Sequence, residues 1–149
     1  SERILRRTVV ENLKRAAPLA REAGITLMVE MLNAWESPRY FLDRLELGLD
    51  IVREVAEPNV RFQFDCYHVQ RMEGHLIDGL VKNLPWIGHV QIADVPGRHE
   101  PGTGEIHHDN VLGALDRAGY DGYVGLEYRP SGKTEDSLAW LPREARARR

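Results

Sequence analysis

The sequence has little cysteine and no long apolar run, and each absence excludes a class of protein. Cys66 is the single cysteine among 149 residues, so no disulfide can form within the chain, which favours a reducing compartment. No apolar run approaches the ~20 residues that a membrane helix needs, and no signal-peptide pattern opens the sequence. We therefore expect a cytoplasmic protein with no membrane partner.

The sequence also lacks an excess of basic residues. Its net charge is −3, and segment 142–149 carries four Arg and one Glu, which leaves −6 on the rest of the chain. Binding of nucleic acid requires a basic face, so we expect no nucleic-acid partner. Segment 142–149 is expected to be a solvated basic tail, because short charge runs usually are. Length and a hydrophobic content of 42% suit a single domain over 1–149.

Four short apolar segments each end near an oxygen-bearing side chain. In VRFQFDCYH, residues 60–68, strand alternation places Phe62 and Phe64 on one face and Gln63 and Asp65 on the other. The same alternation recurs in segments 25–31, 87–93 and 123–128, which carry Glu30, Gln91 and Glu127. Such strands, apolar on the outside and polar at the inner end, are typical of a parallel barrel whose helices cover the outside.

Amphipathic segments separate these strands. Helical spacing of apolar residues predicts helices over 4–23, 42–56, 73–83, 110–118 and 131–146. Pro18 should kink or break the first helix, because proline removes a backbone hydrogen bond. Asp109 is expected to cap the helix at 110, and the long glycine-rich loop Asp94–Asp109 is expected to be functional.

Alternating helices and strands predict an α/β fold with a parallel sheet. The four polar strand ends are 35, 26 and 36 residues apart, close to the ~30 residues of one strand-helix unit. A complete (β/α)₈ barrel of the TIM type needs about 250 residues, so the sequence predicts only four strand-helix units, a half-barrel. The chain also opens on a helix with no preceding strand, as a fragment of a longer barrel would.

The strand ends suggest a metal site. If Glu30, Asp65 and Glu127 converge, a cation is needed to neutralise three carboxylates. Together with the amide oxygen of Gln91 they form an all-oxygen set that suits Mg²⁺ or Mn²⁺, or Zn²⁺ if His68 or His89 joins. The alternatives are ordinary: an acid that caps a loop, a Gln91 that closes the barrel mouth, or a His68 that caps the Asp65 loop.

Several other side chains receive structural interpretations. By strand parity Cys66 points away from Asp65, so we expect a small buried apolar residue rather than a nucleophile. The histidines of the long loop, His107 and His108, are expected at the surface. Three aromatic residues are expected to pack rather than to contact substrate: Tyr67, Trp86 and Tyr128.

Four motifs resemble the hydroxypyruvate isomerase family of xylose isomerase-like barrels. They are VEMLN around Glu30, FDCYH around Asp65, GHVQIADVPGRHEPGTGEI over 88–106 and GYDGYVGLEYRP over 119–130. The resemblance implies that Glu30, Asp65, Gln91 and Glu127 hold a divalent metal and that Glu30 and Glu127 transfer protons. It further implies that His68 and Arg98 contact the substrate, and that the family's first four strands are missing from this sequence.

The implied reaction is the interconversion of hydroxypyruvate and tartronate semialdehyde through an enediolate. Three alternatives stay open. The substrate could be 2-oxo-tetronate or a ketose; the chain could resemble the endonucleases of the same superfamily; or it could be a catalytically incompetent half-barrel. A half-barrel leaves two unpaired edge strands, so we also expect a homo-oligomer, unless the N-terminal half has been removed.

Overall fold

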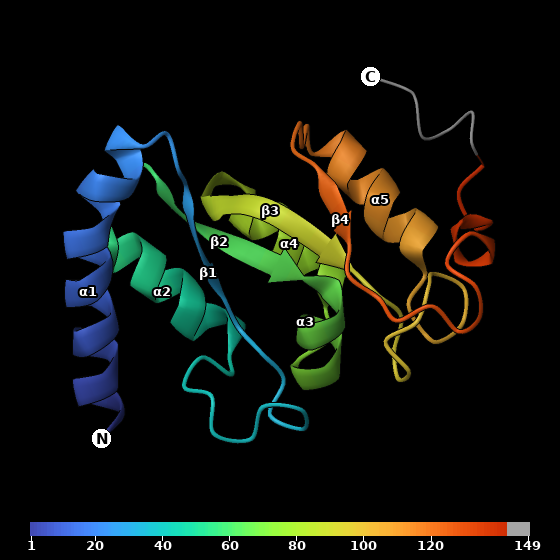
Figure 1. Ribbon diagram of the computed structural model, residues 1–149, viewed down its shortest axis with the longest axis horizontal. Coiled ribbons are helices and arrows are strands. Elements are labelled where there is room, and N and C mark those ends of the chain that lie inside the picture. The colour runs from blue at the N-terminus through green and yellow to red at the C-terminus, as the bar shows by residue number, and fades with distance from the viewer. Residues whose placement is uncertain (143–149) are drawn as a thin grey trace.

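The computed structural model describes residues 1–142 and contains one parallel sheet of four strands in the order β1-β2-β3-β4. The strands are β1 (Leu27–Glu30), β2 (Val60–Asp65), β3 (Ile87–Ile92) and β4 (Val124–Leu126). Successive strands are neighbours, and each pair is parallel (Figure 1). The predicted α/β class and parallel sheet are therefore confirmed, and a half-barrel is consistent with the arrangement.

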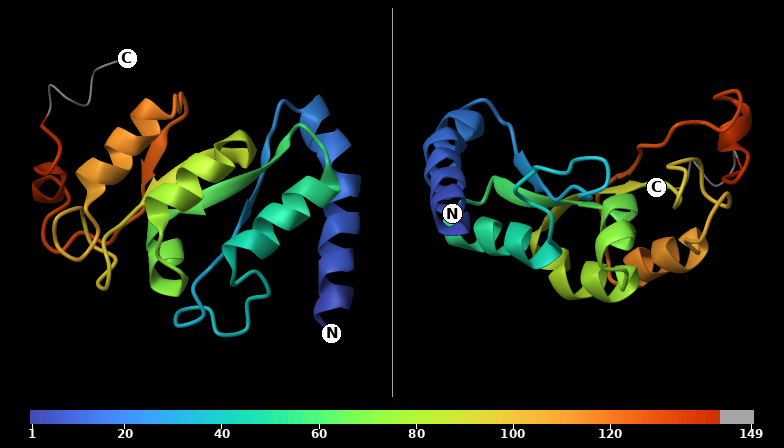
Figure 2. Two further views of the ribbon diagram at one scale, coloured as in Figure 1. Left: turned by 180° about the vertical axis from the view of Figure 1, so that it is seen from behind. Right: turned by 90° about the horizontal axis from the view of Figure 1, so that it is seen from below.

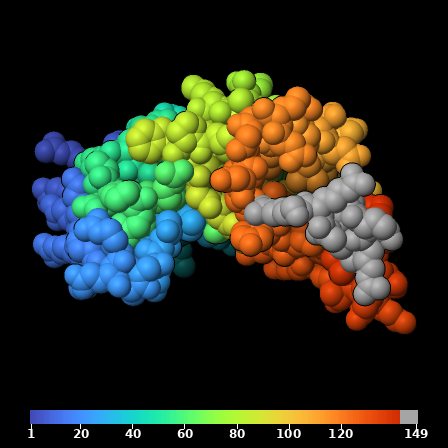
Figure 3. Space-filling view, turned by 90° about the horizontal axis from the view of Figure 1, so that it is seen from above, coloured from blue at the N-terminus to red at the C-terminus, as the bar shows by residue number. Residues whose placement is uncertain are grey.

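The described residues form five α-helices and two 3₁₀ turns. They are α1 (Glu2–Glu22), α2 (Leu45–Val55), α3 (Cys66–Met72), α4 (Leu76–Asn83), α5 (His108–Arg117) and the 3₁₀ turns η1 (Leu84–Trp86) and η2 (Asp136–Leu138). Figure 2 shows α2, α4 and α5 on the same side, with α1 at the edge beside β1. The opposite face of the sheet is concave, and Figure 3 shows the hollow between the first and last strands. No helix within residues 1–142 is both long and apolar enough to cross a membrane.

The core forms between β2 and the helices. Val60, Phe62 and Phe64 are at most 1% exposed, and the two phenyl rings meet edge to face at 6.5 Å between centroids. Gly48 of α2 makes room for this contact, because a Cβ atom there would collide with the Phe62 ring. The apolar face of the strand alternation thus anchors the helical layer to the sheet.

The first helix differs from expectation at Pro18. α1 continues through this proline to Glu22 rather than breaking there. The neighbouring Ala17 is fully buried, and its carbonyl accepts a hydrogen bond from the Asn59 side-chain amide at 2.8 Å. Tertiary contacts therefore hold the helix where local propensity would end it.

A helix that the sequence did not predict follows β2 directly. The Asp65 carboxylate accepts a hydrogen bond from the Tyr67 backbone N–H at 2.8 Å and so caps α3. The predicted helix over 73–83 is correspondingly shorter, because Gly74 and His75 adopt positive φ angles between α3 and α4. Cys66, at the start of α3, is buried as predicted, and burial raises the pKa of its thiol.

Two predictions near the C-terminus are wrong. The N-cap of α5 is His107, whose ring accepts a hydrogen bond from the Asn110 backbone N–H, and Asp109 lies within the helix. Within the described part of 131–146, the helical structure is limited to the turn η2. Ser137 is tied there by hydrogen bonds to the Thr134 carbonyl and from the Tyr128 hydroxyl. Residues 143–149 of the predicted tail lie outside the described residues.

Candidate metal centre

Three of the predicted ligands meet at the carboxyl end of the sheet. Glu30 ends β1, Asp65 ends β2 and Glu127 directly follows β4. Ligand atoms from these residues and from His68 all lie within 4.8 Å of one another. These side chains come from separate strand-helix units, and the parallel sheet brings their ends to one edge, as in barrel active sites.

The carboxylates carry unsatisfied buried oxygens. Glu30 Oε1 and Asp65 Oδ2 are buried and accept no hydrogen bond from the described residues. Burial, reinforced by the charge of Glu127, raises the pKa of Glu30 to about 7. Burial also raises the pKa of Asp65 to about 7, although the Tyr67 N–H opposes the shift. An oxygen-rich site with unpaired buried acceptors fits a divalent cation, which would stabilise the ionised carboxylates.

Gln91 lies beside the carboxylates in the same row of the sheet, paired in register with Asp65. Its Oε1 accepts a hydrogen bond from Gln63 Nε2 at 2.7 Å, and the same nitrogen donates to Glu30 Oε2 at 2.8 Å. Gln63 therefore links Gln91 to Glu30. Strand alternation already placed Gln63 on the face of Asp65, but no role for it was predicted from the sequence.

His68 is buried beside Asp65, and its protonation follows from its neighbours. The backbone N–H of Asn33 donates to Nδ1 at 3.1 Å, so Nδ1 must be the acceptor. The proton of the neutral ring then lies on Nε2, 3.5 Å from Asp65 Oδ2. Burial, followed by the charge of Arg98, lowers the pKa of His68 to about 4. A neutral His68 offers an N–H to the site, which suits a substrate contact better than metal ligation.

Arg98 enters the site from the long loop. Its Nη2 lies 2.5 Å from Glu127 Oε2 and 3.5 Å from Asp65 Oδ2, and its guanidinium lies over the Tyr67 ring at 5.0 Å. Its backbone adopts a φ of 56°, in the left-handed region that non-glycine residues seldom occupy. The structure thus places both predicted substrate-contacting residues, His68 and Arg98, against the carboxylates.

The loop that carries Arg98 is held by a residue that was not singled out from the sequence. The buried Asp94 carboxylate accepts hydrogen bonds at 2.9–3.0 Å from the backbone N–H groups of Val95, Gly102, Gly104 and Ile106. In the sequence, the feature that could have indicated this role is that Asp94 is an acidic residue at the start of a glycine-rich loop.

The loop after β1 adds a second residue that was not predicted from the sequence. Glu36 accepts a hydrogen bond from the Tyr67 hydroxyl at 2.5 Å and lies 3.4 Å from Arg98. Tyr67 is buried as predicted, yet its hydroxyl also belongs to the polar network around the site. In the sequence, the feature that could have indicated a role for Glu36 is its position in the polar loop that follows Glu30.

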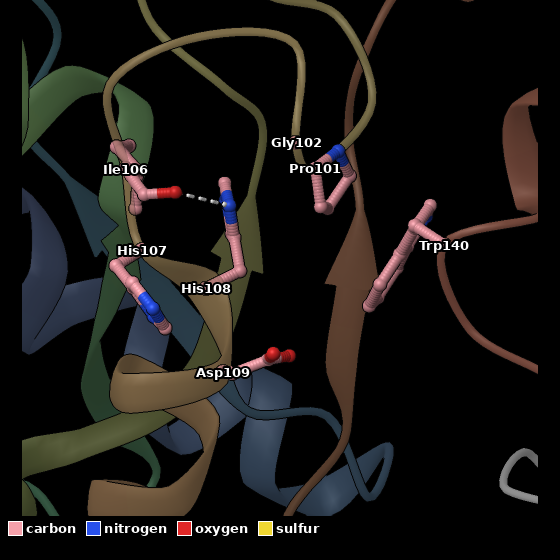
Figure 4. Close-up of a pocket in the computed structure, with 7 residues that line it drawn as sticks. All are labelled: Pro101, Gly102, Ile106, His107, His108, Asp109 and Trp140. Atoms are coloured by element: carbon pink, nitrogen blue, oxygen red, sulfur yellow. Dashed lines mark hydrogen bonds between the residues drawn. The ribbon is translucent and has the colours of Figure 1, made fainter.

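A separate cavity of about 250 Å³ is lined mainly by residues of the loop Asp94–Asp109 (Figure 4). It is lined by Pro101, Gly102, Ile106, His107, His108, Asp109 and Trp140, none of which belongs to the carboxylate cluster. His108 is buried, contrary to the predicted surface position, and its Nδ1 lies 3.1 Å from the Ile106 carbonyl. His107 is exposed as predicted.

The chain is similar to known isomerases. It is 44% identical over 136 residues to the 2-oxo-tetronate isomerase of Cupriavidus necator, covering 91% of this chain and 52% of that protein. It is 40% identical over 134 residues to the hydroxypyruvate isomerase of Escherichia coli, covering 90% and 52%. The chain thus spans about half the length of the curated relatives it matches.

Solved structures share the fold. A crystal structure described as an AP endonuclease, family 2, from Brucella melitensis matches with a TM-score of 0.91 and 41% identity, over 95% of this chain and 55% of that chain. The 3-keto-D-glucoside 4-epimerase of E. coli matches with a TM-score of 0.83 and 29% identity, over 94% and 54%. The family model of the xylose isomerase-like TIM barrel matches residues 2–144. With its parallel sheet and the carboxylates at the strand ends, the chain belongs to the xylose isomerase-like TIM barrel family.

Proposed function

We propose that this chain carries the metal centre of an isomerase that interconverts hydroxypyruvate and tartronate semialdehyde. The observation that carries the proposal is the convergence of Glu30, Asp65 and Glu127 at the mouth of the sheet, where one buried oxygen of Glu30 and one of Asp65 accept no hydrogen bond from the described residues. The similarity to proteins named hydroxypyruvate isomerase and 2-oxo-tetronate isomerase supports the substrate class, a small 2-oxo acid.

Glu30, Asp65, Gln91 and Glu127 would hold the cation, with Mg²⁺ or Mn²⁺ favoured by the all-oxygen donor set. When bound, the ion supplies Lewis-acid stabilisation of negative charge on the substrate oxygens. With its proton on Nε2, His68 acts as a hydrogen-bond donor to the substrate rather than as a fifth ligand.

The two glutamates move the protons. One carboxylate removes a proton from C3 of hydroxypyruvate, and the electron pair of that C–H bond forms an enediolate. The other glutamate delivers a proton to C2, while the hydroxyl proton on the C3 oxygen passes to the C2 oxygen, so that the C2 ketone becomes an alcohol and the C3 alcohol becomes an aldehyde. A pKa of about 7 suits Glu30 to this work near neutral pH. General acid-base catalysis of this kind contributes about 10²–10⁴-fold.

Arg98 and His68 orient the substrate. The guanidinium offers a two-pronged hydrogen bond that suits the substrate carboxylate. Its position between Glu127 and the Tyr67 ring holds it over the centre. An anionic substrate would thus be bound with its reacting carbons between the two glutamates.

The test is turnover of hydroxypyruvate by the purified chain with Mn²⁺, compared with the same sample after chelation. We expect isomerisation that is lost with chelator and restored by Mn²⁺. The first rival, a 2-oxo-tetronate isomerase, is supported by the 44% identity to the C. necator protein and is tested by the same assay with that substrate. Cleavage of abasic DNA with no isomerisation would instead favour the endonuclease activity for which the Brucella protein is named.

The assembly that performs this reaction is part of the proposal. β1 and β4 each have one edge unpaired within the described residues, and the concave face lies open between them. A second copy would pair both edges in a closed two-fold arrangement. Light scattering should show a dimer at working concentration. A stable monomer without turnover would support the alternative of an incompetent half-barrel whose remaining strands lie elsewhere.

A further inference from the structure

Gln63 lies on the concave face and contacts two predicted ligands at once. Gln63 Nε2 donates to Glu30 Oε2 at 2.8 Å and to Gln91 Oε1 at 2.7 Å. The sheet register allows this bridge, because Glu30 is the β1 partner of Gln63. On β3 the partner of Gln63 is His89, and Gln91 lies two residues further along the strand, so Gln63 reaches it diagonally.

The chemistry of the three groups allows one arrangement of the amides. An ionised Glu30 only accepts hydrogen bonds, so the atom of Gln63 that faces it must be the nitrogen. An amide nitrogen has two N–H donors, so the second one requires an acceptor on Gln91, which is Oε1. Gln63 thereby fixes which atom of the Gln91 amide lies toward the carboxylates.

The bridge leaves the coordinating atoms free. Glu30 uses Oε2 for Gln63, while Oε1 is buried and receives no hydrogen bond from the described residues. Gln91 Oε1 has two lone pairs and uses one of them for Gln63. Each predicted ligand is thus held by one hydrogen bond and keeps a lone pair for a cation.

We propose that Gln63 is a positioning residue of the metal centre, which sets the orientation of Gln91 and Glu30 without ligating the ion itself. The inference rests on the proposed function, since it assigns a role toward the same centre. Outer-shell hydrogen bonds of this kind typically change metal affinity by about 10–100-fold when removed.

The test is Mn²⁺ binding by the whole chain, measured by calorimetry without substrate. Gln63→Met keeps the length of the side chain and removes both donors, and we expect Mn²⁺ affinity to fall about 10–100-fold. Gln70→Met is the matched control, because Gln70 donates to Glu105, which is not a predicted ligand, and its loss should leave affinity within about twofold. Gln63→Asn, one methylene shorter, should also weaken binding and serves if Gln63→Met does not fold.

A double-mutant cycle separates positioning from general structural damage. If Gln63 acts through Gln91, Gln63→Met should cost less Mn²⁺ affinity in a Gln91→Met background than in the wild type. Equal losses in both backgrounds would overturn the role of Gln63 toward Gln91, and an unchanged affinity of Gln63→Met would overturn the whole inference while leaving the proposed centre intact. A wild-type chain that binds no Mn²⁺ would overturn the proposed centre and this inference with it.

Discussion

The two faces of β2 do different work. On the helical side, the apolar residues Val60, Phe62 and Phe64 are at most 1% exposed and belong to the hydrophobic core. On the concave side, Gln63 and Asp65 belong to a polar row in which buried oxygens lack partners among the described residues. Alternate residues of one strand thus have different roles. Those on the helical face stabilise the fold by packing, and those on the concave face belong to a carboxylate cluster in which some buried oxygens accept no hydrogen bond from the described part of the chain.

The sharpest way to test this division is to remove charge from the concave side. Glu127→Gln keeps the shape of the side chain but cannot take up a proton, so we expect turnover of hydroxypyruvate to fall by at least about 10²–10⁴-fold. Thermal unfolding should change little, because this side chain is half exposed. Glu22→Gln, at the exposed end of α1, is the control and should leave turnover intact. A Glu127→Gln chain that keeps most of its activity would exclude the assignment.

The converse change is on the helical side. Phe64→Ala removes a ring that is fully buried against Phe62 and Gly79, and should lower the free energy of unfolding by about 3–5 kcal/mol. Urea denaturation measures this loss. Trp35→Ala is the control, because that side chain is 74% exposed and its truncation should cost under about 0.5 kcal/mol. A cost for Phe64→Ala near that of the control would remove the distinction between the faces.

Asp94 combines both roles, because its buried carboxylate stabilises the fold of the loop that carries Arg98 to the carboxylate cluster. Asp94→Asn turns one acceptor of the four-way hydrogen-bond network into a donor that faces backbone N–H groups, and should cost about 2–3 kcal/mol of unfolding free energy. Asp109→Asn, at an exposed position of the same region, should cost only a few tenths. Because the loop carries Arg98, KM for hydroxypyruvate should rise in Asp94→Asn alone. An unchanged KM would show that the loop holds Arg98 without Asp94.

The smallest expected effect is a pH dependence of stability in metal-free protein. The folded pKa values of Glu30 and Asp65, both about 7, lie above their ordinary values of 4.5 and 3.8, so folding favours the protonated forms. Their contribution is complete below about pH 4 and is lost as pH rises through about 7. A loss of about 1 kcal/mol of unfolding free energy would lower Tm by about 2–4 °C.

The measurement compares Tm between pH 5 and pH 8 in chelator, for the wild type and for a Glu30→Gln, Asp65→Asn variant. The wild type should lose more stability across this interval than the variant, and Mn²⁺ should reduce the loss at pH 8. Parallel curves for the two proteins would mean that these carboxyls titrate normally.

Much of the fold was predictable because it follows local periodicity. Alternation over 60–65 predicted β2, and the apolar spacing over 42–56 predicted α2 to within a few residues. The predictions failed where a tertiary contact or a single capping residue determines whether a helix continues or begins. Pro18 stays inside α1 because Ala17 is buried, and α3 exists because the Asp65 carboxylate caps it. Neither contact has a periodic pattern.

The candidate site divides in the same way. The motifs predicted Glu30, Asp65, Gln91 and Glu127 as ligands, and the structure brings the three carboxylates within 4.8 Å of one another along with His68. Their role as ligands stays a prediction. Gln63, Glu36 and Asp94 were missed, because a hydrogen-bond bridge or a loop anchor depends on partners that are distant along the chain.

By itself, the sequence determined the order of the four strands, the apolar face of each and the acid or amide at each strand end, because these depend on neighbours a few residues apart. Only the tertiary structure decided which oxygens stay unpaired, on which nitrogen His68 carries its proton, and which amide joins Glu30 to Gln91. Those properties depend on contacts between separate strands and loops, which exist only once the parallel sheet has brought their ends together.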